Sequence, residues 1–304
     1  MKKENNIYGH FALLFANLIY GINYTVAKGV MPNHLQPFGF IFIRVVGACV
    51  LFWLLSGVIG VYNKIEKRDH LRLALCAFFG VAMNQMFFFN GLNITTPINA
   101  GIIMTLNPVM VLLIGSILIK ERITMLKVIG ILVGMSGAIT LIVFKGEMQV
   151  AKSSALGDLF IFINATAFAV FLVISKPLMN KFHPFVVIRW VFLYGIIYVT
   201  PFGLPEMSEV NWGSFDTGIW ISILYVVVCT TFLAYLLNIF ALNKLNSSVV
   251  SSYIYLQPVF ATIVAIIAGK DSLNLLKVIS AILIFTGVYL VSKKTNDQVS
   301  KPLK

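Results

Sequence analysis

Charged residues are scarce in this sequence, and carboxylates are missing from the middle of its apolar segments. Of its 304 residues, 11% are charged and 59% are hydrophobic, and the mean hydropathy is +0.91. A soluble domain carries roughly 25% charged residues. All eleven Asp and Glu residues lie at the ends of apolar segments or between them. We conclude that water is not the main solvent of this chain.

The sequence also lacks the motifs of several kinds of chemical site. The three cysteines are odd in number and lie inside apolar segments, so we interpret them as packing residues. The four histidines show no metal-ligand spacing, and no nucleotide-binding lysine loop or Ser-His-acid set is present. We therefore expect no metal site, no cofactor and no enzymatic activity. The net charge of +12 is concentrated between the apolar segments, which favours membrane orientation over nucleic-acid binding.

Long apolar segments dominate what is present. A helix needs about 20 apolar residues to cross a bilayer, because each residue advances about 1.5 Å. The segments are too long and continuous for the alternating strands of a membrane barrel. We therefore predict an all-α membrane protein with ten transmembrane helices, at residues 9–29, 38–59, 72–92, 99–118, 126–144, 157–175, 185–203, 217–239, 248–268 and 275–292.

The chain contains a tandem duplication. The sequence from Leu106 to Ile129 returns 150 residues later, from Leu256 to Ile279, without a gap. Nine of the 24 paired positions are identical, where chance would give about two or three. We predict a first repeat at 9–144, a polar linker at 145–156, a second repeat at 157–292 and a cytoplasmic tail at 293–304.

The positive charges predict the orientation of the two repeats. With the N-terminus in the cytoplasm, 16 Lys and Arg residues lie inside and five lie outside, so both termini are expected in the cytoplasm. Each repeat has five spans, an odd number, so the second repeat must enter the membrane inverted. Inverted repeats around a central cavity are typical of transporters that work by alternating access, although a duplication can also serve as a scaffold.

The duplicated segment resembles a known family. Two copies of an aliphatic-x-Pro-Val segment, a Lys-Glu-Arg or Lys-Asp-Ser turn and Leu-Lys-Val-Ile are each preceded by a Pro and an intramembrane Arg. This pattern is similar to the EamA family of the drug/metabolite transporter superfamily. The resemblance implies a permease of the bacterial inner membrane, which exports amino acids or other small metabolites in many members of the family.

Polar side chains inside the spans are the candidates for a substrate-binding cavity. Buried polar residues in membranes are costly and mark substrate pathways, although single ones can also join helices by hydrogen bonds. Our candidates are Asn17, Tyr20, Tyr24, Arg44, Asn84, Asn107, Asn164, Tyr235, Ser252, Tyr255 and Gln257. The same spans contain other polar residues that we do not select, namely Gln85, Thr231, Asn238 and Ser251.

Arginine and proline inside the spans allow two interpretations each. The guanidinium of Arg44 suits a substrate carboxylate, but the side chain could instead extend to the headgroups or tie helix ends together. For Arg189 we favour the second interpretation. Pro108 and Pro258 are expected to kink their helices. Such kinks either expose backbone carbonyls at a binding site formed by interrupted helices or only help the helices to pack.

The sequence therefore predicts a secondary transporter that exports a small organic metabolite such as an amino acid. Because no carboxylate lies at mid-depth, the substrate should be neutral, zwitterionic or anionic. A passive channel or facilitator, or a multi-span protein without transport activity, is the alternative. The expected partners are the small-molecule substrate and the lipid bilayer. Small residues such as Gly134 and Gly287 favour close helix packing or contacts in a homodimer.

Overall fold

The computed structural model describes residues 4–61, 65–143, 154–267 and 273–293, and all regular structure in these ranges is helical. The following elements come before residue 144: α1 (Glu4–Val30), α2 (Pro37–Ile59), α3 (Lys67–Ala77), η1 (Phe78–Met83), α4 (Asn84–Ile94), α5 (Pro97–Met104), α6 (Asn107–Leu118) and α7 (Met125–Val143). The following elements come after residue 154: α8 (Ala155–Lys181), α9 (Pro184–Ser208), η2 (Trp212–Ser214), α10 (Thr217–Tyr225), η3 (Val226–Leu233), α11 (Ala234–Lys244), α12 (Ser247–Ser252), η4 (Tyr253–Tyr255), α13 (Leu256–Ile267) and α14 (Leu275–Ser292).

Nine helical stretches of the described ranges are long and apolar enough to cross a membrane. They correspond to the second to tenth spans expected from the sequence. The first expected span lies in α1, which is 27 residues long but is not among these nine stretches. The expected linker and tail lie largely outside the described residues.

The same elements recur at a constant spacing. The continuous stretch α3–η1–α4 covers residues 67–94, and α10–η3–α11 covers 217–244, so both bounds differ by 150. Each stretch contains a π-helical segment, η1 or η3, at its centre. The fourth expected span is broken between α5 and α6, and the ninth is broken by the 3-10 turn η4 between α12 and α13. The duplication therefore extends from the sequence to irregular features of the backbone.

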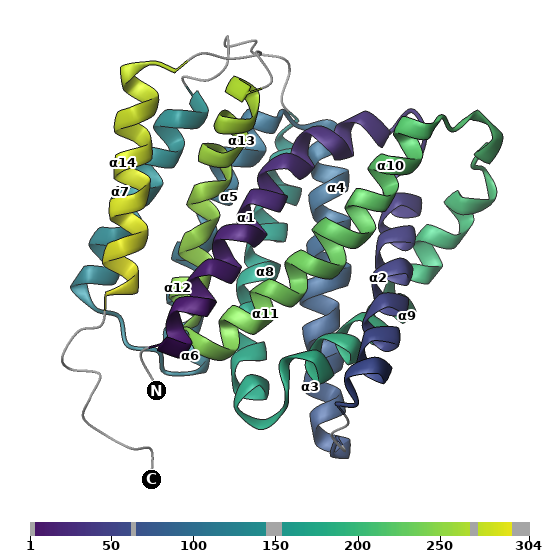
Figure 1. Ribbon diagram of the computed structural model, residues 1–304, viewed down its shortest axis with the longest axis horizontal. Helices are drawn as coiled ribbons and strands as arrows, with labels where there is room; N and C mark the ends of the chain where they lie inside the picture. The colour runs from purple at the N-terminus through teal and green to yellow at the C-terminus, as the bar shows by residue number, and fades with distance from the viewer. Residues whose placement is uncertain (1–3, 62–64, 144–153, 268–272, 294–304) are drawn as a thin grey trace.

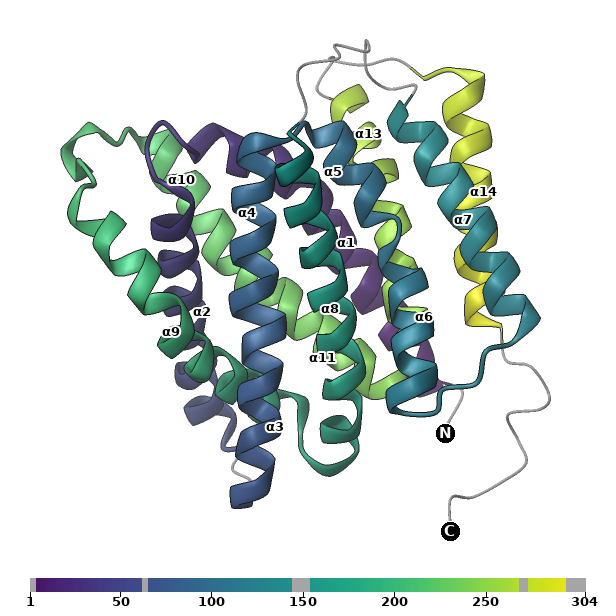
Figure 2. The same cartoon turned by 180° about the vertical axis from the view of Figure 1, so that it is seen from behind.

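Helices that lie far apart in the sequence pack against one another. Helix α1 packs on α11 and α13, whereas its counterpart α8 packs on α4 and α6. Helix α2 packs on α9, and α7 packs on α14. Figures 1 and 2 show that α1 and α8 run through the middle of the bundle, with the α7–α14 pair at one edge and the α2–α9 pair at the other. The first helix of each half therefore lies against the other half.

The outer surface of the bundle is apolar. Large hydrophobic side chains point away from the core on most helices, for example Val58, Ile117 and Ile267, which are 84%, 75% and 81% exposed. Exposure of this extent would be unfavourable in water, but it is what a lipid environment requires. The outer surface therefore fits the hydrocarbon core of a membrane.

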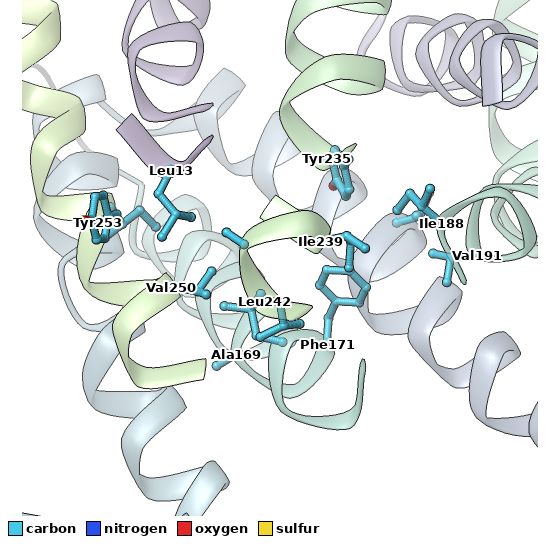
Figure 3. Packing of buried hydrophobic residues seen from close by; sticks show 14 of the residues in the cluster. Leu13, Ala169, Phe171, Ile188, Val191, Tyr235, Ile239, Leu242, Val250 and Tyr253 are labelled. Atoms are coloured by element: carbon cyan, nitrogen blue, oxygen red, sulfur yellow. The ribbon is translucent and has the colours of Figure 1, made fainter. Parts of the chain in front are cut away.

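One end of the bundle is densely packed. The start of α1, the connection from α6 to α7 and the end of α14 all lie at this end, which we call the terminal end (Figure 1). Beyond Tyr235, toward the terminal end, Figure 3 shows Ile239 and Leu242 of α11 together with Ala169 and Phe171 of α8. These four side chains have no exposed surface. Apolar packing therefore closes the centre of the bundle at the terminal end.

Candidate functional site

A cavity lies between the two halves of the chain, at the middle of the bundle. The space open to the centres of water molecules is about 90 Å³, several times what a single water molecule requires. The cavity is lined by Asn17, Tyr20, Asn23, Arg44, Asn84, Gln85, Phe88, Phe89, Met104, Asn164, Phe168, Thr230, Tyr235, Asn238, Val250, Ser251, Ile254 and Gln257. Both halves therefore contribute to it.

Arg44 is the charged residue of the described cavity wall, and no Asp or Glu belongs to that wall. Only 3% of its surface is exposed. Its Nε donates a hydrogen bond of 2.9 Å to Oγ1 of Thr231, and its guanidinium carbon lies 4.5 Å from the centre of the Phe89 ring. Within the described part of the chain, its Nη1 has no hydrogen-bond partner. A buried cation in this state offers a binding site for an anionic group.

Three amide oxygens of the cavity wall also lack a hydrogen-bond partner within the described ranges. They belong to Asn23, Gln85 and Asn164. The amide nitrogen of Asn164 donates to the carbonyl oxygen of Asn84 at 2.6 Å, which fixes its Oδ1 as the free acceptor. Buried polar atoms without a partner are rare in native proteins. These oxygens are therefore available to a donor such as an ammonium group.

Polar residues of the wall are held in place by bonds between the halves. Nε2 of Gln257 in α13 donates to Oδ1 of Asn17 in α1 at 3.0 Å, and Nδ2 of Asn17 donates to the carbonyl of Leu13 at 2.8 Å. The hydroxyl of Tyr235 in α11 donates to the carbonyl of Gly80 in the π segment η1 at 2.9 Å. The wall is therefore ordered before any ligand binds.

Two contacts join residues that are counterparts in the duplication. Gln85 and Tyr235 are 150 residues apart, and Nε2 of Gln85 lies 3.4 Å from the hydroxyl of Tyr235. Thr105 and Tyr255 are also 150 residues apart, and the tyrosine hydroxyl donates to the threonine carbonyl at 3.1 Å. Residues that contact their own counterpart lie where the two halves meet. Gln85 and Tyr235 line the cavity, so the cavity is at this junction.

Seven of the eleven residues selected from the sequence line the cavity. Their role in binding a substrate stays a prediction, because the cavity alone does not identify its ligand. Nothing is described for the side chain of Tyr24. The seven residues are Asn17, Tyr20, Arg44, Asn84, Asn164, Tyr235 and Gln257.

The other three selected residues, Asn107, Ser252 and Tyr255, lie outside the cavity wall, contrary to expectation. Each donates a hydrogen bond to a backbone carbonyl. The acceptors are the carbonyls of Ala165, Val249 and Thr105, at 2.7, 2.8 and 3.1 Å. All three side chains are buried. Asn107 and Tyr255 use their hydrogen-bonding capacity to join helices, whereas Ser252 bonds to the backbone of its own helix, α12.

This placement predicts a structural effect of the substitution Tyr255→Phe. The change removes the hydrogen bond to the carbonyl of Thr105 and keeps the ring, so we expect the free energy of unfolding to fall by about 1 kcal/mol. Ligand affinity of the folded protein should not change. Thermal unfolding of the purified protein and ligand binding measure the two effects, and a large loss of affinity at unchanged stability would contradict the assignment.

Pro108 and Pro258 lie directly after the breaks in their helices. Pro108 is the second residue of α6, and the preceding break is formed by Thr105 and Leu106. Pro258 is the third residue of α13, which follows the 3-10 turn η4. The first turn of a helix has unpaired N–H groups, so proline is tolerated there. Met104 and Ile254, next to these breaks, line the cavity.

Sequence reasoning missed two kinds of lining residue. Asn23 and Thr230 are polar, but no pattern distinguished them from neighbouring residues. Phe88, Phe89 and Phe168 are apolar residues of an apolar chain, which carries no signal in the sequence. The π segments η1 and η3 were also not anticipated, although such segments occur frequently at functional sites.

Arg189 lies outside the cavity. It is 5% exposed, its Nη1 donates hydrogen bonds to Ser56 and to the carbonyl of Val61, and its guanidinium carbon lies 5.0 Å from the centre of the Trp53 ring. These contacts join α9 to the end of α2. The side chain therefore ties helix ends together, which is the interpretation favoured from the sequence.

Comparison with known proteins identifies related sequences along nearly the whole chain. A model of the EamA-like transporter family matches residues 7–143 and again residues 155–293. A protein of Archaeoglobus fulgidus named as an uncharacterized transporter is 28% identical over 294 residues, which is 95% of this chain and 98% of that protein. The uncharacterized transporter YyaM of Bacillus subtilis is 24% identical over 81% of this chain and 80% of its own length.

More distant matches agree with this result. A WAT1-related protein of Arabidopsis thaliana is 23% identical over 73% of this chain and 67% of its own length. A protein of known crystal structure can be superposed with a TM-score of 0.76 at 17% sequence identity, and the match covers 96% of this chain and 98% of that one. The structural match shows that the two chains share a fold.

Proposed function

Because the chain belongs to the EamA-like transporter family, we propose that it is a secondary transporter that exports a small organic metabolite such as an amino acid by alternating access. The family match and the names of the relatives identify a multi-pass membrane transporter and not an enzyme. The substrate, the direction and the mechanism are the content of the proposal.

The proposed mechanism requires two inverted five-helix repeats, 9–144 and 157–292. It is supported by the spacing of 150 residues between matching helices, including the π segments. In Figure 1, α7 and its counterpart α14 lie side by side and run in opposite directions. Two halves with this relation can exchange conformations and so expose a central site to each side of the membrane in turn.

The observation that carries the proposal is the free Nη1 of Arg44 in a cavity whose described wall contains no carboxylate. A guanidinium in this position attracts an anionic group of the substrate. The free oxygens of Asn23, Gln85 and Asn164 accept hydrogen bonds, as an ammonium group requires. A guanidinium together with neutral acceptors complements a zwitterion such as an amino acid.

The remaining wall accommodates a side chain. It contains Phe88, Phe89, Met104, Phe168, Val250 and Ile254. These residues offer apolar surface without a hydrogen-bonding pattern, so they favour apolar over polar side chains and discriminate weakly among apolar ones. We therefore propose one transporter for several related metabolites.

A counterflow experiment tests the function. Proteoliposomes are loaded with a single unlabelled amino acid at millimolar concentration, and uptake of the same radiolabelled amino acid is followed; the series covers the apolar amino acids. A carrier accumulates the label transiently above equilibrium, and the rate saturates with concentration. A channel, the alternative function, equilibrates the label without an overshoot. Absence of any uptake for the whole series would contradict amino-acid transport.

The proposed location is the cytoplasmic membrane of a bacterium, with both termini in the cytoplasm. The excess of Lys and Arg on one side of the membrane supports this orientation. The start of α1 and the end of α14 lie at the same end of the bundle (Figure 1), as the orientation requires. A reporter that is active only in the cytoplasm, fused to either terminus, should be active in both fusions.

A further inference from the structure

A buried ion pair lies at the terminal end of the bundle, outside the cavity. Nζ of Lys127, at the start of α7, lies 2.9 Å from Oε1 of Glu121 in the connection between α6 and α7. The two side chains are 4% and 9% exposed. The same Nζ donates to the carbonyl of Arg122 at 3.0 Å. Buried ion pairs require this kind of additional hydrogen bonding, because both charges have lost their hydration.

The carboxylate of this pair also binds the other half of the chain. Ser248 of α12 donates from its hydroxyl to Oε1 of Glu121 at 2.5 Å and from its backbone N–H at 3.4 Å. Glu121 also attracts Lys176 of α8. Nζ of Lys176 in turn donates to the carbonyls of Leu242 and Leu245 at the end of α11, at 2.5 and 2.6 Å. Glu121 of the first half thus bonds to α12 of the second half and attracts Lys176 of α8, which itself bonds to the end of α11.

The elements held in this way are those that close the cavity. Toward the terminal end, α11 continues from the lining residue Tyr235 to buried Ile239 and Leu242, and α8 continues from Phe168 to buried Ala169 and Phe171. Figure 3 shows Ala169 and Leu242 next to Val250 of α12. We expect a path from the cavity to the terminal end to separate α8, α11 and α12. Separation of α8 from α11 breaks the bonds of Lys176 to the carbonyls of Leu242 and Leu245, and movement of α12 away from the α6–α7 connection breaks the bond between Ser248 and Glu121.

The sequence differs between the two repeats at the positions that correspond to Glu121 and Ser248. The duplication pairs Glu121 with Asp271, which is shorter by one methylene group, and Ser248 with Ile98, which has no hydroxyl. In the sequence, the hydroxyl that Ser248 offers to Glu121 therefore has no counterpart at position 98. A difference of this kind favours closure of one end of the cavity over the other.

We propose that Glu121, Lys127 and Ser248 form a latch that closes the terminal end of the cavity and opens once per transport cycle. The proposal rests on the alternating access proposed above. Glu121 acts as a gating residue that does not touch the substrate. Its bonds to Lys127 and Ser248 stabilise the conformation in which the terminal end is closed, so their loss shifts the equilibrium toward a conformation open at that end.

Cysteine labelling tests the latch without a substrate. The reporter is Ala169→Cys in a full-length chain whose three native cysteines are replaced by alanine. It is reconstituted in nanodiscs and treated with a membrane-impermeant maleimide. Ala169 is fully buried in the closed end, so labelling should be slow. Glu121→Gln should increase the rate about tenfold or more, because it leaves Lys127 without its ionic partner. Ser248→Ala should increase it less, and Ser248→Thr, which keeps a hydroxyl, should restore the slow rate.

Two controls separate opening from general loosening. Glu66→Gln removes a carboxylate whose pKa is lowered by hydrogen bonds from Arg68 and Lys181, but this carboxylate is half exposed and its loss should not change the labelling of Ala169→Cys. Ala138→Cys, fully buried in α7, should stay slow in the Glu121→Gln chain. Equal acceleration at both reporters, or no acceleration by Glu121→Gln and Ser248→Ala, would overturn the latch.

The outcome is independent of the counterflow experiment. Faster labelling of Ala169→Cys together with no uptake of any amino acid would support the latch and refute the proposed substrate. Intact counterflow together with unchanged labelling in both latch variants would refute the latch alone.

Discussion

The substitution Arg44→Gln is expected to weaken binding of a transported amino acid by about 100-fold, because it removes a buried cation from a charge-assisted pair. Arg44 is 3% exposed and its Nη1 is free for a ligand. Arg44→Lys keeps the charge but loses the planar fork, so its affinity should lie between those of the other two proteins. Binding of the amino acid that shows the largest counterflow, measured on purified protein, gives the three dissociation constants.

The methyl ester of the same amino acid identifies the group that Arg44 contacts. The ester lacks the carboxylate charge, so the unchanged protein should bind it about 100-fold more weakly than the acid. The Arg44→Gln protein should bind the acid and the ester almost equally. If Arg44→Gln weakens the acid and the ester by the same factor, the arginine does not contact the carboxylate.

Arg189→Gln is the matched control for this substitution. Arg189 is buried to a similar extent, but it lies outside the cavity and donates to Ser56 and to the carbonyl of Val61. Its loss should lower the thermal stability of the protein and leave the affinity for the amino acid unchanged. A loss of affinity comparable to that of Arg44→Gln would show that the effect does not arise in the cavity.

The helical framework could be predicted from the sequence because the bilayer restricts the solutions. A backbone in hydrocarbon must satisfy its own hydrogen bonds, so each long apolar segment implies a helix. The duplication predicted which helices correspond, and α7 and α14 indeed differ by 150 at their first residue. The first and last residues of the helices were predicted less accurately than their order along the chain. For example, α9 continues to Ser208, five residues beyond its expected end, through Pro201 and Pro205.

The cavity could be predicted only in part, because a polar residue in an apolar helix has two ways to satisfy its hydrogen bonds. Asn164 uses one polar atom and Asn17 uses both for hydrogen bonds within the protein, and both residues still line the cavity. Asn107 and Ser252 use their side chains for backbone carbonyls away from it. The sequence does not distinguish these two outcomes, since both depend on the rotation of each helix about its axis. Phe88 and Phe168 became lining residues through that same rotation.

The pair α7 and α14 carries the closest backbone contact that we find among the described glycines. A Cβ atom at Gly287 would lie 2.5 Å from both the Cα and the backbone nitrogen of Gly134, and 2.6 Å from the carbonyl oxygen of Gly130. None of these atoms belongs to a side chain that could rotate away. Glycine at this position therefore sets the distance between the two helices, as small residues do at membrane helix interfaces. Because α7 and α14 belong to opposite halves, the contact also joins the halves.

We therefore expect Gly287→Ala to lower the stability of the folded protein by about 1 to 3 kcal/mol, since one methyl group forces two backbones apart. Gly57→Ala is the matched control. Gly57 also lies within a long helix, α2, but a Cβ there would meet no atom within 4 Å, so alanine should leave the stability unchanged or raise it by up to about 1 kcal/mol. Thermal unfolding of the two variants in the same detergent measures the difference. Equal melting temperatures would mean that α7 and α14 can separate freely, and the close approach of the two helices would then contribute nothing to holding the halves together.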